Sequence, residues 1–200
     1  MSREDMCILG AGGHAKIVIA TAESAGWNIV SVHDDDTEKQ NKFILEHPVL
    51  GALSNARGVS HIAIGDNRRR RLIAERLSLE WKSLIHKSAL VHASVTVGQG
   101  SLICAGAIVQ PGAIIGEHVI INTGAVVEHD CVVGDFSHIA PRACVAGNVS
   151  IGPGCLIGVG AIVMPQITLG SWCVAGAGSV VTKNLDNEVK VAGVPAKVVR

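Results

Sequence analysis

The stretch that decides the fold spans residues 89–184 and reads ALVHAS, VTVGQG, SLICAG, AIVQPG, AIIGEH, VIINTG, AVVEHD, CVVGDF, SHIAPR, ACVAGN, VSIGPG, CLIGVG, AIVMPQ, ITLGSW, CVAGAG, SVVTKN. These are sixteen consecutive units of six residues with none left over, and the third residue of every unit is apolar. An α-helix has about 3.6 residues per turn, so a repeat of six drifts around it and cannot stay on one face. The pattern predicts a parallel β-solenoid instead, in which three units close one triangular coil of about eighteen residues.

The residue types inside each unit fit such a coil. The third residue fills the axis of the prism, and the residue two places before it is usually small, as crowding near a corner requires. Glycine and proline gather at the fourth to sixth places, where the chain must bend.

Composition favours a protein that binds small molecules. The 200 residues suffice for one medium or two small domains, and 17 basic residues balance 17 acidic ones. With no net charge and few aromatic residues, nothing favours nucleic acid or a membrane as a partner. No signal peptide or apolar stretch of membrane-spanning length is evident, so we expect a cytoplasmic protein. Its six cysteines should then be reduced and mostly fill the core.

The chain before the repeat alternates short strands and helices. We expect strands at 6–9, 29–32 and 61–64, helices at 15–25 and 67–77, and a linker around Pro48 and Gly51. This alternation predicts a small Rossmann-like α/β domain with a parallel sheet. We place that domain at residues 1–85 and the solenoid with a C-terminal tail at 86–200.

The turn GAGGHA at residues 10–15 follows the first strand and opens the first helix. Backbone N–H groups at a helix N-terminus can bind a pyrophosphate, and Asp34 stands near the place of a ribose-binding acid. By itself the turn is equally well explained as a compact connection. Only one mononucleotide-binding half precedes the repeat, so a nucleotide with one base fits better than NAD.

The histidines of the repeat lack the spacing of a metal site. Some triangular solenoids are zinc enzymes of the carbonic anhydrase type, whose ligands come from adjacent coils or from a neighbouring subunit. No pair among His92, His118, His129 and His138 is separated by one coil. We therefore expect no metal, and a zinc site shared between subunits stays the alternative.

His129 occupies a corner, the fifth place of AVVEHD, beside Asp130. A corner side chain projects from the prism, and an adjacent carboxylate can fix one imidazole tautomer and stabilise the protonated ring. The simpler alternative is a solvated polar corner. Gly147 follows one coil later, so the two should stack about 4.8 Å apart. A histidine base beside a glycine N–H suits acyl transfer, and Asn122 could hydrogen-bond near that face or join a buried ladder.

Seven motifs are distributed along nearly the whole chain: GAGGHAK (10–16), DDD (34–36), IAIGDN (62–67), LIHKSAL (84–90), INTGAVVEHDCVVGDFSHIAP (121–141), AGNVSIG (146–152) and AGVPAK (192–197). In these motifs the chain resembles the hexapeptide-repeat acyltransferases. Within them it is similar to the family of sialic acid O-acetyltransferases and of the UDP-4-amino-sugar N-acetyltransferase of bacillosamine synthesis. The resemblance implies a left-handed parallel β-helix after the α/β domain, acetyl-CoA as cosubstrate, and a homotrimer with active sites between neighbouring solenoids.

The resemblance also implies roles for individual residues. His129 would be the general base, and Asp130 would raise its basicity. The nucleotide sugar would be bound by Gly12, Gly13, His14, Asp34, Asp35 and Gly65. Acetyl-CoA would be contacted by His138, Gly147, Val159 and Ala177, the last of which stands where the family often has glycine.

We therefore expect an N-acetyltransferase that acts on the 4-amino group of a nucleotide-linked 4-amino-4,6-dideoxy sugar, by direct attack of the amine on acetyl-CoA. O-acetylation of a sialic acid is the enzymatic alternative. A non-enzymatic trimeric scaffold and a zinc hydratase are the others. The residues specify neither the nucleotide base nor the sugar.

Overall fold

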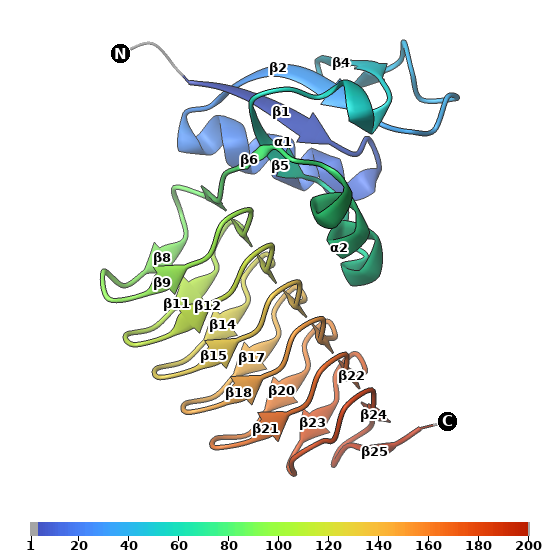
Figure 1. Ribbon diagram of the computed structural model, residues 1–200. Coiled ribbons are helices and arrows are strands. Elements are labelled where there is room, and N and C mark those ends of the chain that lie inside the picture. The colour runs from blue at the N-terminus through green and yellow to red at the C-terminus, as the bar shows by residue number, and fades with distance from the viewer. Residues whose placement is uncertain (1–3, 200) are drawn as a thin grey trace.

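The computed structural model describes residues 4–199, so residues 1–3 and 200 of the two predicted domains lie outside the described residues. An N-terminal α/β domain sits at one end of a parallel β-helix (Figure 1), and this confirms the predicted fold class. Within residues 4–199, no helix combines the length and the apolar character needed to cross a membrane.

The N-terminal sheet has six strands in the order β3-β4-β2-β1-β5-β6. All neighbours are parallel except β3 and β4. The elements are β1 (Asp5–Leu9), α1 (Gly13–Ala25), β2 (Asn28–His33), β3 (Phe43–Ile44), β4 (His47–Gly51), the short 3-10 helix η1 (Leu53–Asn55), β5 (Val59–Ile62), α2 (Asn67–Arg76) and β6 (Glu80–Trp81).

The predicted linker around Pro48 and Gly51 is wrong, because this segment is strand β4. Its side chains alternate, with Val49 and Gly51 buried and Pro48 and Leu50 exposed. Proline is tolerated because Val49 forms the hydrogen bonds of this edge, donating to the carbonyl of Lys42 at 2.8 Å. Strand β4 has only five residues, and its proline and glycine concealed the alternation of buried and exposed residues that is typical of a strand.

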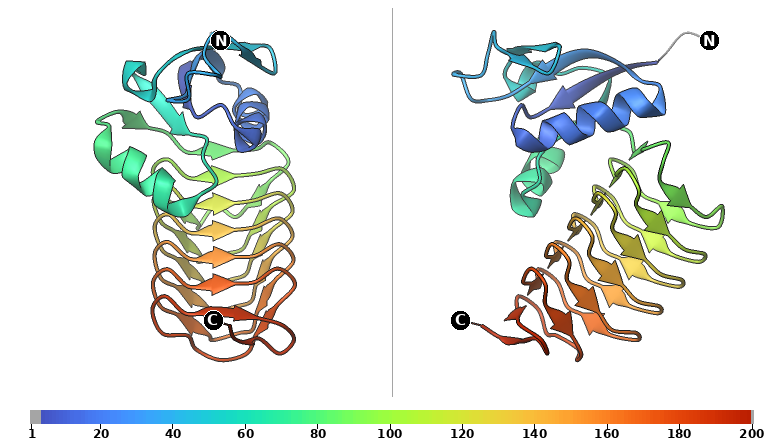
Figure 2. Two further views of the ribbon diagram at one scale, coloured as in Figure 1. Left: turned by 90° about the vertical axis from the view of Figure 1, so that its right-hand side faces the viewer. Right: turned by 180° about the vertical axis from the view of Figure 1, so that it is seen from behind.

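Three parallel sheets form the faces of the β-helix, and each coil adds one short strand to each sheet (Figure 2). The first face consists of β7 (Leu84–Ile85), β10 (Leu102–Ile103), β13 (Ile120–Ile121), β16 (His138–Ile139), β19 (Leu156–Ile157), β22 (Val174–Ala175) and β24 (Lys190–Ala192), edged by the antiparallel β25 (Lys197–Val198). The second face consists of β8 (Leu90–Val91), β11 (Ile108–Val109), β14 (Val126–Val127), β17 (Cys144–Val145), β20 (Ile162–Val163) and β23 (Val180–Val181). The third face consists of β9 (Thr96–Val97), β12 (Ile114–Ile115), β15 (Val132–Val133), β18 (Ser150–Ile151) and β21 (Thr168–Leu169).

Packing follows the six-residue frame. Third-place residues pair coil to coil, as Ile121 does with Ile139, and they form the buried core together with the small first-place residues. Every sixth-place residue from Gly100 to Gly178 has φ between 52° and 76°. Glycine adopts this left-handed conformation at least cost, which explains why so many units end in glycine.

The β-helix starts one unit before the frame read from the sequence, because β7 pairs with β10. Strand β6 still belongs to the six-stranded sheet of the N-terminal domain. The chain therefore passes from one domain to the other at Lys82 and Ser83, just before the predicted boundary between residues 85 and 86. Ala15 and Val18 of α1 belong to one apolar cluster with Leu84 and Leu102 of the first face. The N-terminal domain is therefore packed onto the first coils of that face. All six cysteines are free thiols, and five are buried.

Candidate active site

A cleft of about 770 Å³ opens where β1, β2 and β5 end in the N-terminal domain. The carboxyl ends of parallel strands are the usual ligand site of such sheets. The structure brings all six predicted nucleotide-sugar residues to this cleft: Gly12, Gly13, His14, Asp34, Asp35 and Gly65.

The glycines of the turn after β1 have different roles. Gly10 has φ of 113°, and a Cβ there would lie 2.9 Å from Cγ1 of Ile64, so close approach to the end of β5 requires glycine. A Cβ on Gly12 or Gly13 would meet no atom within 4 Å. Packing does not demand glycine at these two positions, and their missing side chains keep the cleft open beside the N-terminus of α1.

Asp34 fixes the shape of the turn. Its Oδ2 accepts hydrogen bonds from the Ala11 N–H at 2.7 Å and from Lys39 Nζ at 3.1 Å, and Oδ1 accepts from the Asp36 N–H at 2.9 Å. Burial alone would raise the pKa of Asp34, but the N–H groups of Asp36 and Ala11 and the ammonium of Lys39 together hold it below its ordinary value. The carboxylate is therefore ionised, and both of its oxygens are engaged.

Asp35 stands on the same wall with a partly exposed carboxylate. Its Oδ1 accepts from the Leu53 N–H at 2.9 Å, and Oδ2 pairs with Nη2 of Arg76 at 3.0 Å. Burial raises the pKa of Asp35, but Arg76 and the Leu53 N–H outweigh burial and lower it. Arg69 and Lys39 also line the cleft, so its acidic and basic groups are mixed.

A second cleft of about 520 Å³ lies between the start of α2 and the first face of the β-helix. Gly65 and Asp66 line both clefts, so the two adjoin along this strip. Two predicted acetyl-CoA residues, His138 and Val159, line the second cleft. Ala177 stands at the same corner as Val159, one coil on, and is exposed.

His14 and His138 face each other across the strip, with ring centroids 6.3 Å apart. Burial, and next the charge of Arg70, lowers the pKa of each to about 4, so both rings are neutral at pH 7. Nε2 of His14 is buried and has no hydrogen-bond partner among the described residues. This pair places two neutral imidazoles where the clefts meet.

Asn122 fixes the tautomer of His138. Its Oδ1 accepts the Thr123 N–H at 2.7 Å, so its Nδ2 is left to donate to Nε2 of His138 at 3.0 Å. The proton of His138 then resides on Nδ1. Asn122 was expected near His129 or in a buried ladder, and both expectations are wrong because the first-face corner points it at His138.

His129 and Asp130 form a dyad on another corner, between the second and third faces. Nδ1 of His129 lies 2.9 Å from Oδ2 of Asp130, and the two side chains are 55% and 62% exposed. Asp130 has φ of 58°, a conformation that aspartate tolerates better than most residues and that turns its carboxylate toward the preceding side chain. A Cβ on Gly112, one coil earlier, would lie 2.5 Å from Oδ1 of Asp130. Glycine at that position therefore leaves room for the carboxylate.

Gly147 lies against His129, as the repeat predicts. A Cβ on Gly147 would come 2.6 Å from Nε2 of His129, so a side chain would displace the ring. The Gly147 carbonyl accepts from Gln166, whereas its N–H donates to no group among residues 4–199. A histidine nitrogen and an unused backbone donor thus stand together at one corner.

Within one chain, the dyad of His129 and Asp130 lies far from both clefts. His129 and Gly147 occupy the vertex between the second and third faces, and a triangular prism places that vertex opposite its first face. The first face carries His138 and the second cleft. Of the predicted acetyl-CoA residues, Gly147 is therefore the one that the fold separates from His138 and Val159.

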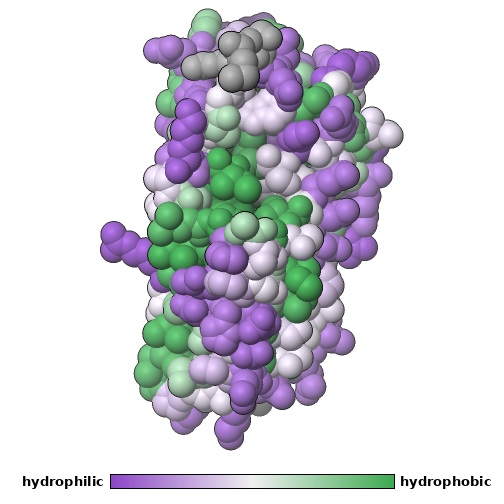
Figure 3. Space-filling view, turned by 90° about the vertical axis from the view of Figure 1, so that its left-hand side faces the viewer, coloured by the Kyte–Doolittle hydropathy of each residue, from purple (hydrophilic) through white to green (hydrophobic). Residues whose placement is uncertain are grey.

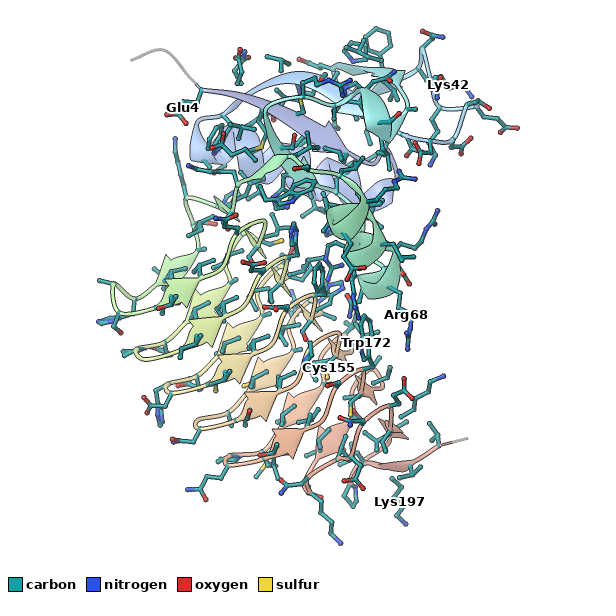
Figure 4. All side chains as sticks on the ribbon, viewed as in Figure 1. Glu4, Lys42, Arg68, Cys155, Trp172 and Lys197 are labelled. Atoms are coloured by element: carbon teal, nitrogen blue, oxygen red, sulfur yellow. The ribbon has the colours of Figure 1, made fainter. Side chains whose placement is uncertain are left out.

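Sequence reasoning missed two residues of the domain junction. Arg70 of α2 is 1% exposed and lies between the clefts, although the sequence showed only a basic helix. The guanidinium of Arg68 lies 4.4 Å from the ring centroid of Trp172, at the edge where α2 meets the β-helix (Figure 4). No sequence signal separates these two arginines from the other arginines of α2.

No group of three His, Cys, Asp or Glu side chains within residues 4–199 is arranged to hold a metal ion.

Comparisons with known proteins match both domains. The model of the PglD N-terminal domain matches residues 5–77, and that of the bacterial transferase hexapeptide (six repeats) matches residues 112–147. The chain is similar to the acetyltransferase domain of PglB from Neisseria gonorrhoeae FA1090, with 38% identity and a TM-score of 0.92, over 98% of this chain and 100% of that one. The same domain in complex with acetyl coenzyme A gives a TM-score of 0.91 at 38% identity, with the same coverage.

A second solved relative is PerB from Caulobacter crescentus, in complex with CoA and GDP-perosamine. It is 36% identical, with a TM-score of 0.92 over 98% of this chain and 97% of that one. Among curated proteins, the chain is 32% identical over 99 residues to "Uncharacterized protein L142" of Acanthamoeba polyphaga mimivirus. The match covers 47% of this chain, and it spans only 20% of that relative's length.

Proposed function

The chain belongs to the hexapeptide-repeat sugar acetyltransferases that carry a PglD-type N-terminal domain, and we propose that it transfers acetyl from acetyl-CoA to the 4-amino group of a nucleotide-linked 4-amino-4,6-dideoxy sugar. One observation carries the proposal: Nε2 of His129 stands beside Gly147, while Asp130 holds Nδ1 at 2.9 Å. The solved relatives with acetyl coenzyme A, or with CoA and GDP-perosamine, support the two substrate classes.

The proposed reaction needs a base and an oxyanion donor. The sugar amine attacks the thioester carbonyl, and a C–N bond forms as Nε2 of His129 takes the amine proton. Asp130 stabilises the resulting imidazolium, and the unused Gly147 N–H donates to the oxyanion. The tetrahedral intermediate collapses, its C–S bond breaks, and His129 returns the proton to the departing thiolate of CoA.

Each cleft suits one substrate. The nucleoside diphosphate would bind at Gly12, Gly13 and the N-terminus of α1, because these residues line the cleft and a helix N-terminus offers backbone N–H groups to phosphate. His14, Asp34, Asp35 and Gly65 would complete this site. The acyl end of acetyl-CoA would lie beside His138 and Val159, with Gly147 and Ala177 as further contacts. No metal takes part in this scheme.

We propose a homotrimer, because the dyad and the clefts lie on opposite sides of one prism. The neighbour's vertex, with its His129, would enter the site at the first face. The outward second-place residues of the second face support association, since all six are apolar: Leu90, Ile108, Val126, Cys144, Ile162 and Val180. Green apolar patches interrupt the hydrophilic surface in Figure 3, and such patches mark contact sites.

The free thiols suit the cytoplasmic location that we propose.

Mass spectrometry of reactions with acetyl-CoA tests this function. The panel contains UDP-, dTDP- and GDP-linked 4-amino sugars, their 4-hydroxyl counterparts, and free sialic acid. We expect a mass gain of one acetyl group on an amino sugar. Acetylation of sialic acid alone would contradict the proposal and favour the O-acetyltransferase.

A further inference from the structure

Arg70 is the largest fully buried side chain of the described residues. No carboxylate of residues 4–199 forms an ion pair with it, although the nearby charge of Asp66 raises the pKa of Arg70 in opposition to burial. Burying an unpaired guanidinium is costly, and it persists only where its hydrogen bonds are satisfied. An arginine buried at position 70 therefore lowers the free energy of unfolding unless its contacts at the domain junction compensate.

The guanidinium binds carbonyls from both domains. Nε donates to the His118 carbonyl at 2.8 Å, and Nη2 donates to the Phe136 carbonyl at 2.8 Å. Nη1 donates to the carbonyls of Ile64 at 3.0 Å and Gly65 at 3.2 Å. One planar group therefore joins the segment after β5 to two successive coils.

The β-helix presents these acceptors at one edge. His118, Phe136 and Gly154 are sixth-place residues of successive coils, and no backbone N–H of the described residues bonds to their carbonyls. Asn67 continues the series, since its Nδ2 donates to the carbonyls of Gly154 at 3.1 Å and Cys155 at 3.0 Å. Its Oδ1 accepts from Nη2 of Arg70 at 2.8 Å. Arg70 and Asn67 together fix the position of helix α2 relative to three successive coils.

The segment that Arg70 holds is the wall shared by the clefts. Gly65 lines both, and a Cβ on it would touch the His14 ring at 3.8 Å. His138 belongs to β16, and β16 begins two residues after the Phe136 carbonyl that Arg70 binds. A shift of this guanidinium would therefore move His14 relative to His138.

We propose that Arg70 is a positioning residue that sets the distance between the bound amino sugar and the acetyl thioester. This inference rests on the proposed function. Only a planar fork with five N–H groups can reach carbonyls on both domains at once, which excludes lysine as an equivalent. A misplacement of about 1 Å can cost roughly 10²-fold in rate even when each substrate still binds.

The test compares Arg70→Met and Arg70→Lys with Arg71→Met. Arg71 lies on the same helix, is half-exposed, pairs with Glu75 and lines neither cleft. Its guanidinium lies 5.8 Å from the ring centroid of Trp172, so Arg71→Met controls for the loss of an arginine that packs against the β-helix. Calorimetric titration with acetyl-CoA and with nucleotide sugar counts competent sites, and kcat is then expressed per site at a temperature below unfolding. We expect Arg70→Met to lower kcat by about 10- to 100-fold at full stoichiometry, Arg70→Lys to be intermediate, and Arg71→Met to match wild type.

A wild-type kcat per competent site in Arg70→Met would overturn the inference, because Arg70 would then only stabilise the fold. If Arg70→Met does not fold, Arg70→Lys decides the question by the same criterion. A wild-type enzyme that acetylates no amino sugar refutes the proposed function itself. An active wild type with unaffected variants refutes the role of Arg70 alone.

Discussion

The imidazole of His129 occupies the space that a side chain on Gly147, one coil further along the β-helix, would fill. A Cβ at Gly147 would lie 2.6 Å from Nε2 and 2.7 Å from Cε1 of that ring. Because the ring is an exposed side chain, it can swing away from an added methyl group, whereas the backbone cannot. The contact therefore controls the direction of Nε2 without supporting the fold.

Gly147→Ala should lower kcat by about 10- to 100-fold through displacement of His129, while the thermal midpoint stays close to that of wild type. Steady-state kinetics and thermal unfolding check the two halves of this statement. In a His129→Ala background the same change should cost nothing further, because the ring that it displaces is gone. Additive losses would contradict the account.

Asn122→Asp should disturb His138 through its tautomer. The amide donates to Nε2 of His138 at 3.0 Å, whereas a carboxylate at that place could only accept. His138 would then carry a proton on Nε2, and we expect weaker acetyl-CoA binding by about tenfold. Nitrogen-15 NMR of the imidazole reports the tautomer, and calorimetry reports the affinity. An unchanged spectrum would show that Asn122 does not set the tautomer.

Acid should weaken the fold through four histidines, of which His61 and His118 are buried and His14 and His138 half-buried. Burial lowers the pKa of each from 6.5 to about 4, and the charge of Arg70 adds to every shift. Between these values the unfolded chain binds protons that the native chain does not, so the free energy of unfolding falls as pH drops from about 6.5 to 4. Denaturant titrations across this range measure the slope.

His118→Phe provides the control for this slope. His118 stacks on Phe136 at 5.2 Å between centroids and meets the edge of Trp81 at 5.3 Å, so phenylalanine should preserve the packing. The variant should show a shallower dependence on pH. A wild-type protein whose unfolding free energy is flat from pH 7 to 4 would refute this reading of the junction.

The six-residue repeat predicted the contact between His129 and Gly147, but it carried no information on the N-terminal domain or on the junction between the domains. Counting in coils placed His129 against Gly147 because the solenoid fixes which residues stack, whatever the rest of the chain does. The strand β4 escaped prediction because Pro48 and Gly51 conceal an alternation over only five residues. Sequence could not single out Arg70 among its neighbours, since its partners are backbone carbonyls from coils far along the chain.

Mixed trimers test whether the site forms between subunits. His129→Ala removes the base, and Gly12→Trp fills the nucleotide cleft, starting from a Cβ that would meet no protein atom within 4 Å. Each variant alone should be inactive. When the two are co-expressed with different tags, about one quarter of interfaces pair an open cleft with an intact His129, so about a quarter of wild-type activity should return. No recovery would place the whole site within one chain.

The central claim is that His129 is the base for acetyl transfer, and it is tested most directly by His129→Ala. Acetyl transfer to the nucleotide-linked amino sugar and acetyl-CoA affinity are measured on the same preparation. The account predicts that kcat falls by about 10²- to 10⁴-fold while the Kd for acetyl-CoA stays within a few-fold of wild type. A His129→Ala protein with wild-type kcat would contradict it.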